Sequence, residues 1–235
     1  LVSWRCRDDN FDTDFGFNGR LQFCYTKRDV NIFGLAANDQ SNGFESDNEN
    51  NAPTGHSALP RTKARVSNMT LIGPYADSAS ASNGNLTKWQ HEALIRRSSE
   101  FSIYNSVLVG WPFGPQVRDT ATQRAAVDNR LEIRNTSVGA SQGTASIFTQ
   151  TVTTTPTPVI TFDPLAWFNA AGKNNRGSTP RQWGPGSAMN FTAAAFSLDA
   201  TNNPVPGAGT ELATAGSALD GRLAGDSFFT ATTYR

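Results

Sequence analysis

Residues 8–17, DDNFDTDFGF, alternate between polar and aromatic side chains. One parity holds acidic and amide residues at four successive positions, Asp8, Asn10, Asp12 and Asp14. The other parity holds phenylalanine at positions 11, 15 and 17. Successive side chains of a strand point to opposite faces, whereas a helix would mix the two sets. The pattern therefore predicts a strand with an acidic row on one face and an aromatic row on the other.

A second pattern recurs along the chain at a longer period. RVSNMTLIG (65–73), SIYNSVLVG (102–110) and EIRNTSVGA (132–140) each carry a β-branched residue, a spacer, an asparagine, a short apolar step and a glycine. The asparagines are Asn68, Asn105 and Asn135, which are 37 and 30 residues apart. A fainter pair, FDTD (11–14) and FESD (44–47), is separated by 33 residues.

Short strands that recur at unequal periods are typical of a solenoid whose turns vary in length. The sequence therefore predicts an all-β fold, a right-handed parallel β-helix with long loops. Its coils would place the three asparagines above one another at a strand spacing of ~4.8 Å, as a structural ladder of hydrogen-bonded amides. The β-branched residue two positions before each asparagine would point inward. A β-sandwich with coincidental repeats is the alternative.

The coils are predicted over residues 1–140. Residues 141–235 are rich in turns and loops, and we expect this irregular C-terminal tail to pack on or cap the solenoid within the same domain. The sequence opens at LVSWRCRDD and stops at TTYR in mid-pattern, so we expect a segment of a longer protein whose N- and C-terminal flanks are missing.

Composition narrows the class of protein. Charged residues make up 17% of the 235 residues and the formal net charge is zero, which argues against nucleic-acid binding. No stretch approaches the ~20 apolar residues of a membrane span. Abundant Gly, Ser, Thr and Asn favour an extracellular all-β protein. Cys6 and Cys24 could form a disulfide there if their strands are neighbours, or remain free thiols.

The acidic row is the first candidate for chemistry. If FDTD and FESD lie on adjacent coils, Asp12 stacks near Glu45 and Asp14 near Asp47. Two like charges ~5 Å apart repel by roughly 3 kcal/mol at an effective dielectric of ~20, so a cation, raised pKa values or arginines must offset the repulsion. Oxygen ligands suit a structural calcium ion. The candidate ligands are Asp8, Asn10, Asp12, Asp14, Glu45 and Asp47. The alternative is neutralisation by flanking arginines, at Arg5, Arg7, Arg20 and Arg28.

Several stretches resemble one known family. They are DDNFDTDFGFNGRLQF, SNGFESDN, IRRSSEFSIYNSVLVGWPFG and the closing DSFFTATTYR. Together they resemble secreted, right-handed β-helix-like surface proteins common in Bacteroidetes, a family without an assigned activity. The resemblance covers most of residues 1–140 and implies the fold and a location that is secreted or on the outer cell surface. DAFE-like and GAFG-like stretches of that family are absent here, as expected for a segment.

Function is left with three hypotheses. The first is a non-enzymatic extracellular protein that binds a polysaccharide or cell-surface glycan, in adhesion or assembly. Trp111 and Tyr104 could stack on sugar rings, and Arg96 and Arg97 could hold acidic sugars or brace a loop. The second is a calcium-dependent polysaccharide lyase acting on uronic-acid polymers, with Arg28 or Lys27 beside the acidic row. The third is a self-assembling fibre or sheath subunit, because an exposed β-helix end is a template for another coil.

Overall fold

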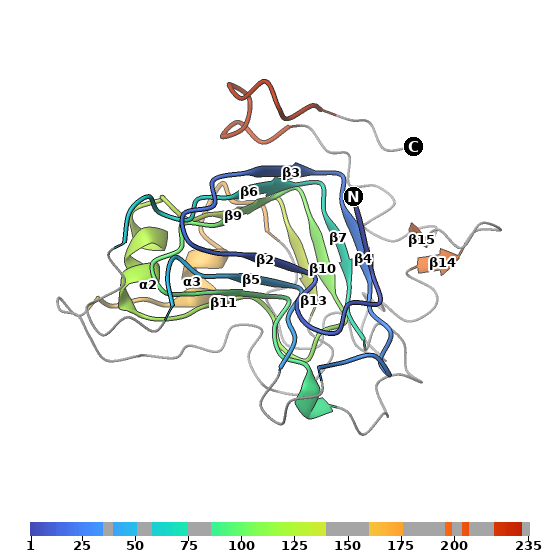
Figure 1. The fold of residues 1–235 in the computed structure, drawn as a ribbon. Helices are drawn as coiled ribbons and strands as arrows, with labels where there is room; N and C mark the ends of the chain where they lie inside the picture. Colours follow the sequence, from blue (N-terminus) through green and yellow to red (C-terminus); the bar gives the residue numbers. More distant parts are fainter. Residues whose placement is uncertain are drawn as a thin grey trace.

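The protein forms a parallel β-helix, in which short strands stack on the strands of neighbouring coils (Figure 1). The computed structural model describes residues 1–34, 40–50, 58–74, 86–139, 160–175, 196–198, 204–206 and 219–231. Within these residues, three parallel sheets run along the solenoid and every coil passes through them in the same order. The predicted fold class is thus confirmed.

The three sheets are called A, B and C below. Sheet A contains β1 (Val2–Trp4), β4 (Tyr25–Lys27), β7 (Thr70–Ile72), β10 (Val107–Val109) and β13 (Ser137–Gly139). Sheet B contains β2 (Phe11–Thr13), β5 (Phe44–Ser46), β8 (Ala93–Ile95) and β11 (Gln116–Val117). Sheet C contains β3 (Arg20–Gln22), β6 (Arg65–Ser67), β9 (Ser102–Tyr104) and β12 (Ile133–Arg134). Outside the sheets lie η1 (Leu86–Lys88), α2 (Thr120–Val127), α3 (Pro164–Phe168) and the antiparallel pair β14 (Phe196–Leu198) and β15 (Pro204–Pro206).

The strand register agrees with the repeats in the sequence. In sheet B, Phe11 pairs with Phe44 and Asp12 with Glu45, so FDTD lies beside FESD as predicted. In sheet C, the residues two positions before the repeated asparagines pair in one row; they are Val66, Ile103 and Ile133. All three are fully buried, which confirms that they point inward.

Stacked apolar rows fill the interior. Phe11 packs on Phe44 with ring centroids 5.5 Å apart, and Phe44 packs on Phe101 at 5.1 Å. Leu71 and Leu108 form another row and have no exposed surface. Each such side chain contributes about 1.5–3 kcal/mol by leaving water, and the contacts run from coil to coil, so burial of these rows is what holds the coils together.

The corner between sheets C and A explains the repeated asparagine. Asn68, Asn105 and Asn135 have φ values of 54°, 49° and 49°, in the left-handed region that asparagine tolerates better than most residues. Their backbone N–H groups continue the ladder; that of Asn68 donates to the Tyr104 carbonyl at 3.2 Å. The side-chain oxygen of Asn68 accepts from Gln22 Nε2 at 3.0 Å. The corner thus depends on backbone conformation, while the amide-to-amide ladder stays a prediction.

The aromatic row of the first strand is shorter than the alternation predicts. β2 ends at Thr13, and Phe15 lies in a turn with φ of 49°. Phe15 and Phe17 are therefore 69% and 45% exposed rather than packed behind the acids. The first coil leaves six large apolar side chains exposed, which are Leu1, Val2, Trp4, Phe15, Phe17 and Phe23. Self-association through this end stays a prediction.

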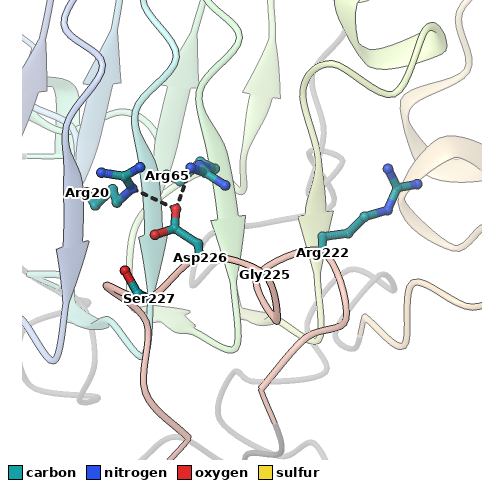
Figure 2. Close-up of a pocket in the computed structure, with 6 residues that line it drawn as sticks. All are labelled: Arg20, Arg65, Arg222, Gly225, Asp226 and Ser227. Atoms are coloured by element: carbon teal, nitrogen blue, oxygen red, sulfur yellow. Dashed lines mark hydrogen bonds and ion pairs between the residues drawn. The ribbon is translucent and has the colours of Figure 1, made fainter.

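Much of the predicted C-terminal cap, 141–235, lies outside the described residues, but two segments of it are in place. Residues 160–175 lie against the last coil, where Asn135 N–H donates to the Lys173 carbonyl at 2.7 Å and Phe168 is buried in the core. Residues 219–231 lie on the outer face of sheet C (Figure 2). No helix in the described part of the chain has the length and hydrophobicity needed to cross a bilayer.

The left-handed corner can be tested by replacing Asn68 with glycine and, separately, with valine. Both changes remove the amide, so the difference between the two variants measures the cost of the backbone conformation alone. We expect Asn68→Val to be less stable than Asn68→Gly by about 1–3 kcal/mol, because a β-branched residue resists positive φ. Chemical denaturation monitored by circular dichroism provides the measurement, and equal stability of the two variants would contradict this role of the corner.

Candidate functional site

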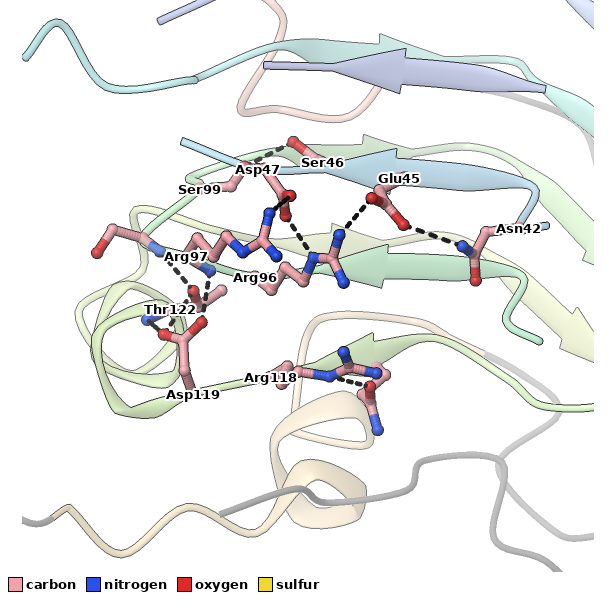
Figure 3. Close-up of polar contacts among 12 residues, drawn as sticks. Asn42, Glu45, Ser46, Asp47, Arg96, Arg97, Ser99, Arg118, Asp119 and Thr122 are labelled. Atoms are coloured by element: carbon pink, nitrogen blue, oxygen red, sulfur yellow. Dashed lines mark hydrogen bonds and ion pairs between the residues drawn. The ribbon is translucent and has the colours of Figure 1, made fainter. Parts of the chain in front are cut away.

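Charged side chains gather on the outer face of sheet B (Figure 3). The strand register puts Asp12, Glu45, Leu94 and Gln116 in one outward row. Backbone hydrogen bonds from Asp47, Arg96 and Arg118 to the coil before each of them continue the ladder. The next outward row is therefore Asp14, Asp47, Arg96 and Arg118. The acids occupy the first two coils of this face and the arginines the next two.

Ion pairs join the acidic and basic coils. Arg96 donates from Nε to Asp47 Oδ1 at 2.7 Å and from a terminal nitrogen to Glu45. Arg97 donates to the other oxygen of Asp47 at 2.5 Å. The far oxygen of Glu45 accepts from Asn42 Nδ2 at 3.1 Å. Charge-assisted bonds of this kind are about twice as strong as neutral ones, and those of Arg96 and Arg97 also link neighbouring coils.

Arg118 ends the basic row. Its Nε donates to Gln116 Oε1 at 2.8 Å, and among the described residues it has no carboxylate partner. Its backbone continues into Asp119, which caps α2 by accepting from the Thr122 N–H at 2.9 Å and also accepts from the Arg97 N–H. Burial, and next the neighbouring Arg96 charge, lower the pKa of Arg118. Arg118 therefore lies beside a second guanidinium and has no carboxylate of its own among the described residues, so its N–H groups could donate to a ligand anion.

Three carboxyl groups on or next to this face, those of Glu45, Asp12 and Asp9, have raised pKa values. Burial raises the pKa of Glu45 to about 7, against the opposing pull of Arg96. Asp12 keeps exposed surface, but partial desolvation of its carboxyl group, reinforced by the charges of Asp14 and Asp47, raises its pKa to about 6. Burial and next the charge of Glu45 raise the pKa of Asp9 to about 8, although the Asn42 N–H donates to it. The repulsion expected between stacked acids is therefore met partly by protonation and partly by arginine.

The six candidate calcium ligands do not converge as one set. Asp12, Asp14, Glu45 and Asp47 face outward together, but Glu45 and Asp47 are already held by arginines. Asn10 is buried, and its amide donates to Thr26 Oγ1 at 2.5 Å and to Ser3 Oγ at 3.0 Å. Asp8 offers its backbone carbonyl to Arg28. No group of three or more His, Cys, Asp or Glu side chains in the described residues is arranged to hold a metal ion.

The arginines that neutralise the row are not the four expected. Arg28 is buried, and its guanidinium lies 4.5 Å from the centre of the Trp89 ring. Arg5 pairs with Asp29, and Arg20 with Asp226 on sheet C. The lysine considered for a lyase, Lys27, is in sheet A. Sequence proximity indicated Arg5, Arg7, Arg20 and Arg28, whereas stacking brings Arg96 and Arg97 from the adjacent coil onto Glu45 and Asp47.

The predicted sugar-stacking aromatics are covered. Trp111 is fully buried and packs edge-on against Trp89 with ring centroids 5.9 Å apart. Tyr104 faces outward from sheet C but is only 4% exposed, because Leu223 and Phe229 pack over it. Neither ring can stack on a sugar in this conformation. Arg96 and Arg97 remain on the candidate site, where both brace the acids and are half-buried.

The two cysteines are free thiols, so the disulfide considered from the sequence is not formed. Cys6 Sγ lies 2.9 Å from Ser3 Oγ, whereas Cys24 is buried in the apolar core. The side chains point to different surroundings.

The sequence reasoning missed Arg118 and Asp9. A signal for Arg118 was present, because QVRD (116–119) carries charge at the same step after its strand as LIRR (94–97) and ESD (45–47). The repeated asparagines mark the corner between sheets C and A, so they gave no signal for QVRD, which lies in sheet B. Asp9 is adjacent to the acidic row but has the opposite parity, so the alternation assigned it no role.

A family model described as a pectate-lyase like beta helix domain matches residues 1–188. The chain belongs to this family. The match covers most of the described coils, including all four strands of sheet B. No curated protein and no solved structure matches the chain. For this pectate-lyase-like β-helix, the family thus supports the fold and a carbohydrate-related role outside the cell.

The raised carboxyl pKa values give the stability of this β-helix a characteristic pH dependence. A carboxyl group whose folded pKa exceeds its unfolded value takes up a proton on folding, so its contribution to stability is lost as pH rises towards the folded pKa. For Asp9 this window runs from the ordinary value of 3.8 to about 8. We expect Asp9→Asn, which keeps an acceptor for the Asn42 N–H, to raise stability at pH 8 by at least about 1 kcal/mol, the equivalent of one pKa unit.

Urea denaturation at pH 5 and pH 8 measures this effect. The matched control is Asp29→Asn, because hydrogen bonds from Asn31 and Arg5 lower the pKa of Asp29. That variant should lose stability at pH 8 instead of gaining it. A neutral or destabilising effect of Asp9→Asn at pH 8 would contradict the burial of this charge.

Proposed function

We propose that the outer face of sheet B binds an extracellular polysaccharide, and preferentially an acidic one that carries uronate groups. The single observation that carries the proposal is the order of charges on this face, with arginines on two coils directly continuing the row of acids on the two coils before. The family supports the carbohydrate-related part of the proposal.

The basic end of the face supplies the preference for acidic sugars. Guanidinium groups bind carboxylates through parallel N–H donors. Arg96 is largely used by Glu45 and Asp47, whereas Arg118 has no carboxylate partner among the described residues. A uronate carboxylate at Arg118 would supply that partner and relieve the repulsion between Arg118 and Arg96.

The acidic end suits the hydroxyl groups of the same chain. Carboxylates accept hydrogen bonds from hydroxyl donors. Asp12 is exposed and Asp14 half-buried on the outer surface, and neither is paired with an arginine among the described residues. A sugar chain running along the solenoid would therefore meet acceptors on the first coils and donors on the later ones. In this arrangement the ion pairs of Arg96 with Glu45 and Asp47 hold the acidic and the basic coils of the face together.

Replacing Arg118 with glutamine tests the proposal. The expected result is a loss of affinity for a polygalacturonate of about tenfold or more, the size of one charge-assisted hydrogen bond. Binding is measured by isothermal titration calorimetry at low and moderate salt, with a neutral glucan as the ligand control. The matched variant is Lys27→Gln on sheet A, which removes the same charge from another face and should bind normally. An equal loss of affinity in both variants would mean that the effect comes from net charge alone, and it would contradict a binding site at Arg118.

A lyase is the second candidate, and one observation favours it. Glu45 and Asp12 have pKa values of about 7 and about 6, and burial lowers that of Arg118, so groups of both kinds on this face are shifted towards the pH at which acid–base chemistry runs. Lyase action on a uronate polymer creates an unsaturated product that absorbs in the near ultraviolet. The binding proposal expects no such absorbance with any uronate polymer, with or without calcium. An increase in absorbance that is lost in Arg118→Gln would contradict the binding proposal and support a lyase.

A further inference from the structure

A second charged surface lies on another face of the solenoid, the outer face of sheet C. There, a pocket of about 390 Å³ opens between β3, β6 and the segment 219–231 (Figure 2). Its lining consists of Arg20, Arg65, Arg222, Gly225, Asp226 and Ser227. The family match ends at residue 188, so the segment that forms one wall of this pocket lies beyond it.

The strand register brings the first two arginines together. Arg20 and Arg65 are direct partners on neighbouring strands and point to the same outer face. Like charges directly opposite each other destabilise a pair of strands. Asp226 lies between them, and its Oδ2 accepts from Arg20 Nε at 2.6 Å and from Arg65 Nη2 at 2.5 Å. One carboxylate thus serves two guanidinium groups.

The third arginine comes from the segment itself. Arg222 is half-exposed, and its Nε lies 3.4 Å from the buried carboxylate of Glu132. Glu132 also lies 3.6 Å from Arg134, so it is shared in its turn. On this face four arginines therefore share three carboxylates. The arginines are Arg20, Arg65, Arg134 and Arg222, and the carboxylates are Glu132, Asp220 and Asp226.

Apolar packing and hydrogen bonds hold the pocket walls in addition to the ion pairs. Leu223 and Phe229 pack over Tyr104, and both are buried. Thr230 and Gln22 exchange hydrogen bonds, with Gln22 Nε2 donating to the Thr230 carbonyl at 2.7 Å and the Thr230 N–H donating to Gln22 Oε1 at 3.0 Å. Asp220 accepts from Asn135 Nδ2 at 2.6 Å. The docked segment consequently forms one wall of an open pocket on the outer face of sheet C.

Donors remain available inside it. Each guanidinium carries five N–H donors. Arg20 reaches Asp226 through Nε alone, and its terminal nitrogens have no partner among the described residues. Ser227 adds a hydroxyl at the rim. Arg20 and Arg65 share the single carboxylate of Asp226, whereas the Arg222 side chain extends away from them towards Glu132 (Figure 2). This part of the pocket therefore has one more cation than anion, and its remaining capacity is for a second anion with several acceptor oxygens.

We propose that this pocket binds a single oxyanion group, the sulfate or carboxylate of an acidic polysaccharide, at a site separate from sheet B. Guanidinium clusters recognise such groups by forked hydrogen bonds. The polysaccharide as the source of the anion rests on the proposed function, whereas the oxyanion site itself does not. A free inorganic anion shares the same chemistry and is the alternative source.

The test uses the full chain with two probes, inorganic sulfate and a sulfated oligosaccharide of defined length, in titration calorimetry. Arg20→Gln and Arg65→Gln each remove one of the two guanidinium groups that share Asp226 in the pocket. We expect each to weaken binding of both probes by about tenfold. Arg5→Gln is the matched control, since Arg5 is likewise an exposed arginine paired with an aspartate. Its affinity should be unchanged, and circular dichroism checks that all three variants are folded.

The outcomes separate this site from the one on sheet B. Arg118→Gln should leave sulfate affinity unchanged while it reduces polygalacturonate affinity, so either proposal can fail alone. Binding of inorganic sulfate without the oligosaccharide would overturn the polysaccharide as the source. No binding of either probe, or equal affinities in Arg20→Gln, Arg65→Gln and Arg5→Gln, would overturn the site.

Discussion

The register of each coil on the next is set at the corner between sheets C and A. A single residue in the left-handed region makes this corner in successive coils, at Phe23, Asn68, Asn105 and Asn135. Because strand side chains alternate between faces, a slip of one residue would move every core residue outward. The loops between sheets A and B differ in length from coil to coil, yet the register downstream of each is preserved. The connections between sheets B and C also differ in length, whereas the corner between sheets C and A always has the same length. Insertions are therefore absorbed at the other two corners, while this corner keeps the stacking in register.

This register also arranges the charges. Side chains that are separated by dozens of residues form continuous outward rows, so compensation runs between coils rather than along the chain. Arg96 contacts Glu45 and Asp47 of the preceding coil, and all three are mostly withdrawn from water. Removing one partner of such a network leaves an uncompensated buried charge, which costs more than the ion pair contributes. The contacts that stabilise the stack and those that shape the recognition surface are thus the same.

The sequence was sufficient for what is periodic. The spacing of Asn68 and Asn105 and the match of FDTD with FESD predicted the parallel stacking, because both arise from backbone conformation and alternation repeated in every coil. The sequence did not show which outward side chains are covered by segments that lie far away along the chain. Tyr104 faces outward from its strand, as a sugar-binding residue would, but a segment more than a hundred residues later covers it. Likewise α2 was not anticipated, since its polar sequence TATQRAAV has little amphipathic pattern and begins at the cap supplied by Asp119.

The two charged faces differ in how they depend on the rest of the chain. Sheet B is complete within the coils, so its ligand would bind a surface that the stacking has already formed. The pocket on sheet C exists only while residues 219–231 are docked, and Asp226 supplies part of the docking by joining Arg20 and Arg65. A ligand that binds only the docked state stabilises docking. At concentrations above its Kd, this stabilisation grows with the logarithm of the ligand concentration. An anion held by Arg20 and Arg65 beside Asp226 would join strands of the first two coils at the place where the C-terminal segment docks, and it would therefore act on the cohesion of the solenoid as well as on recognition.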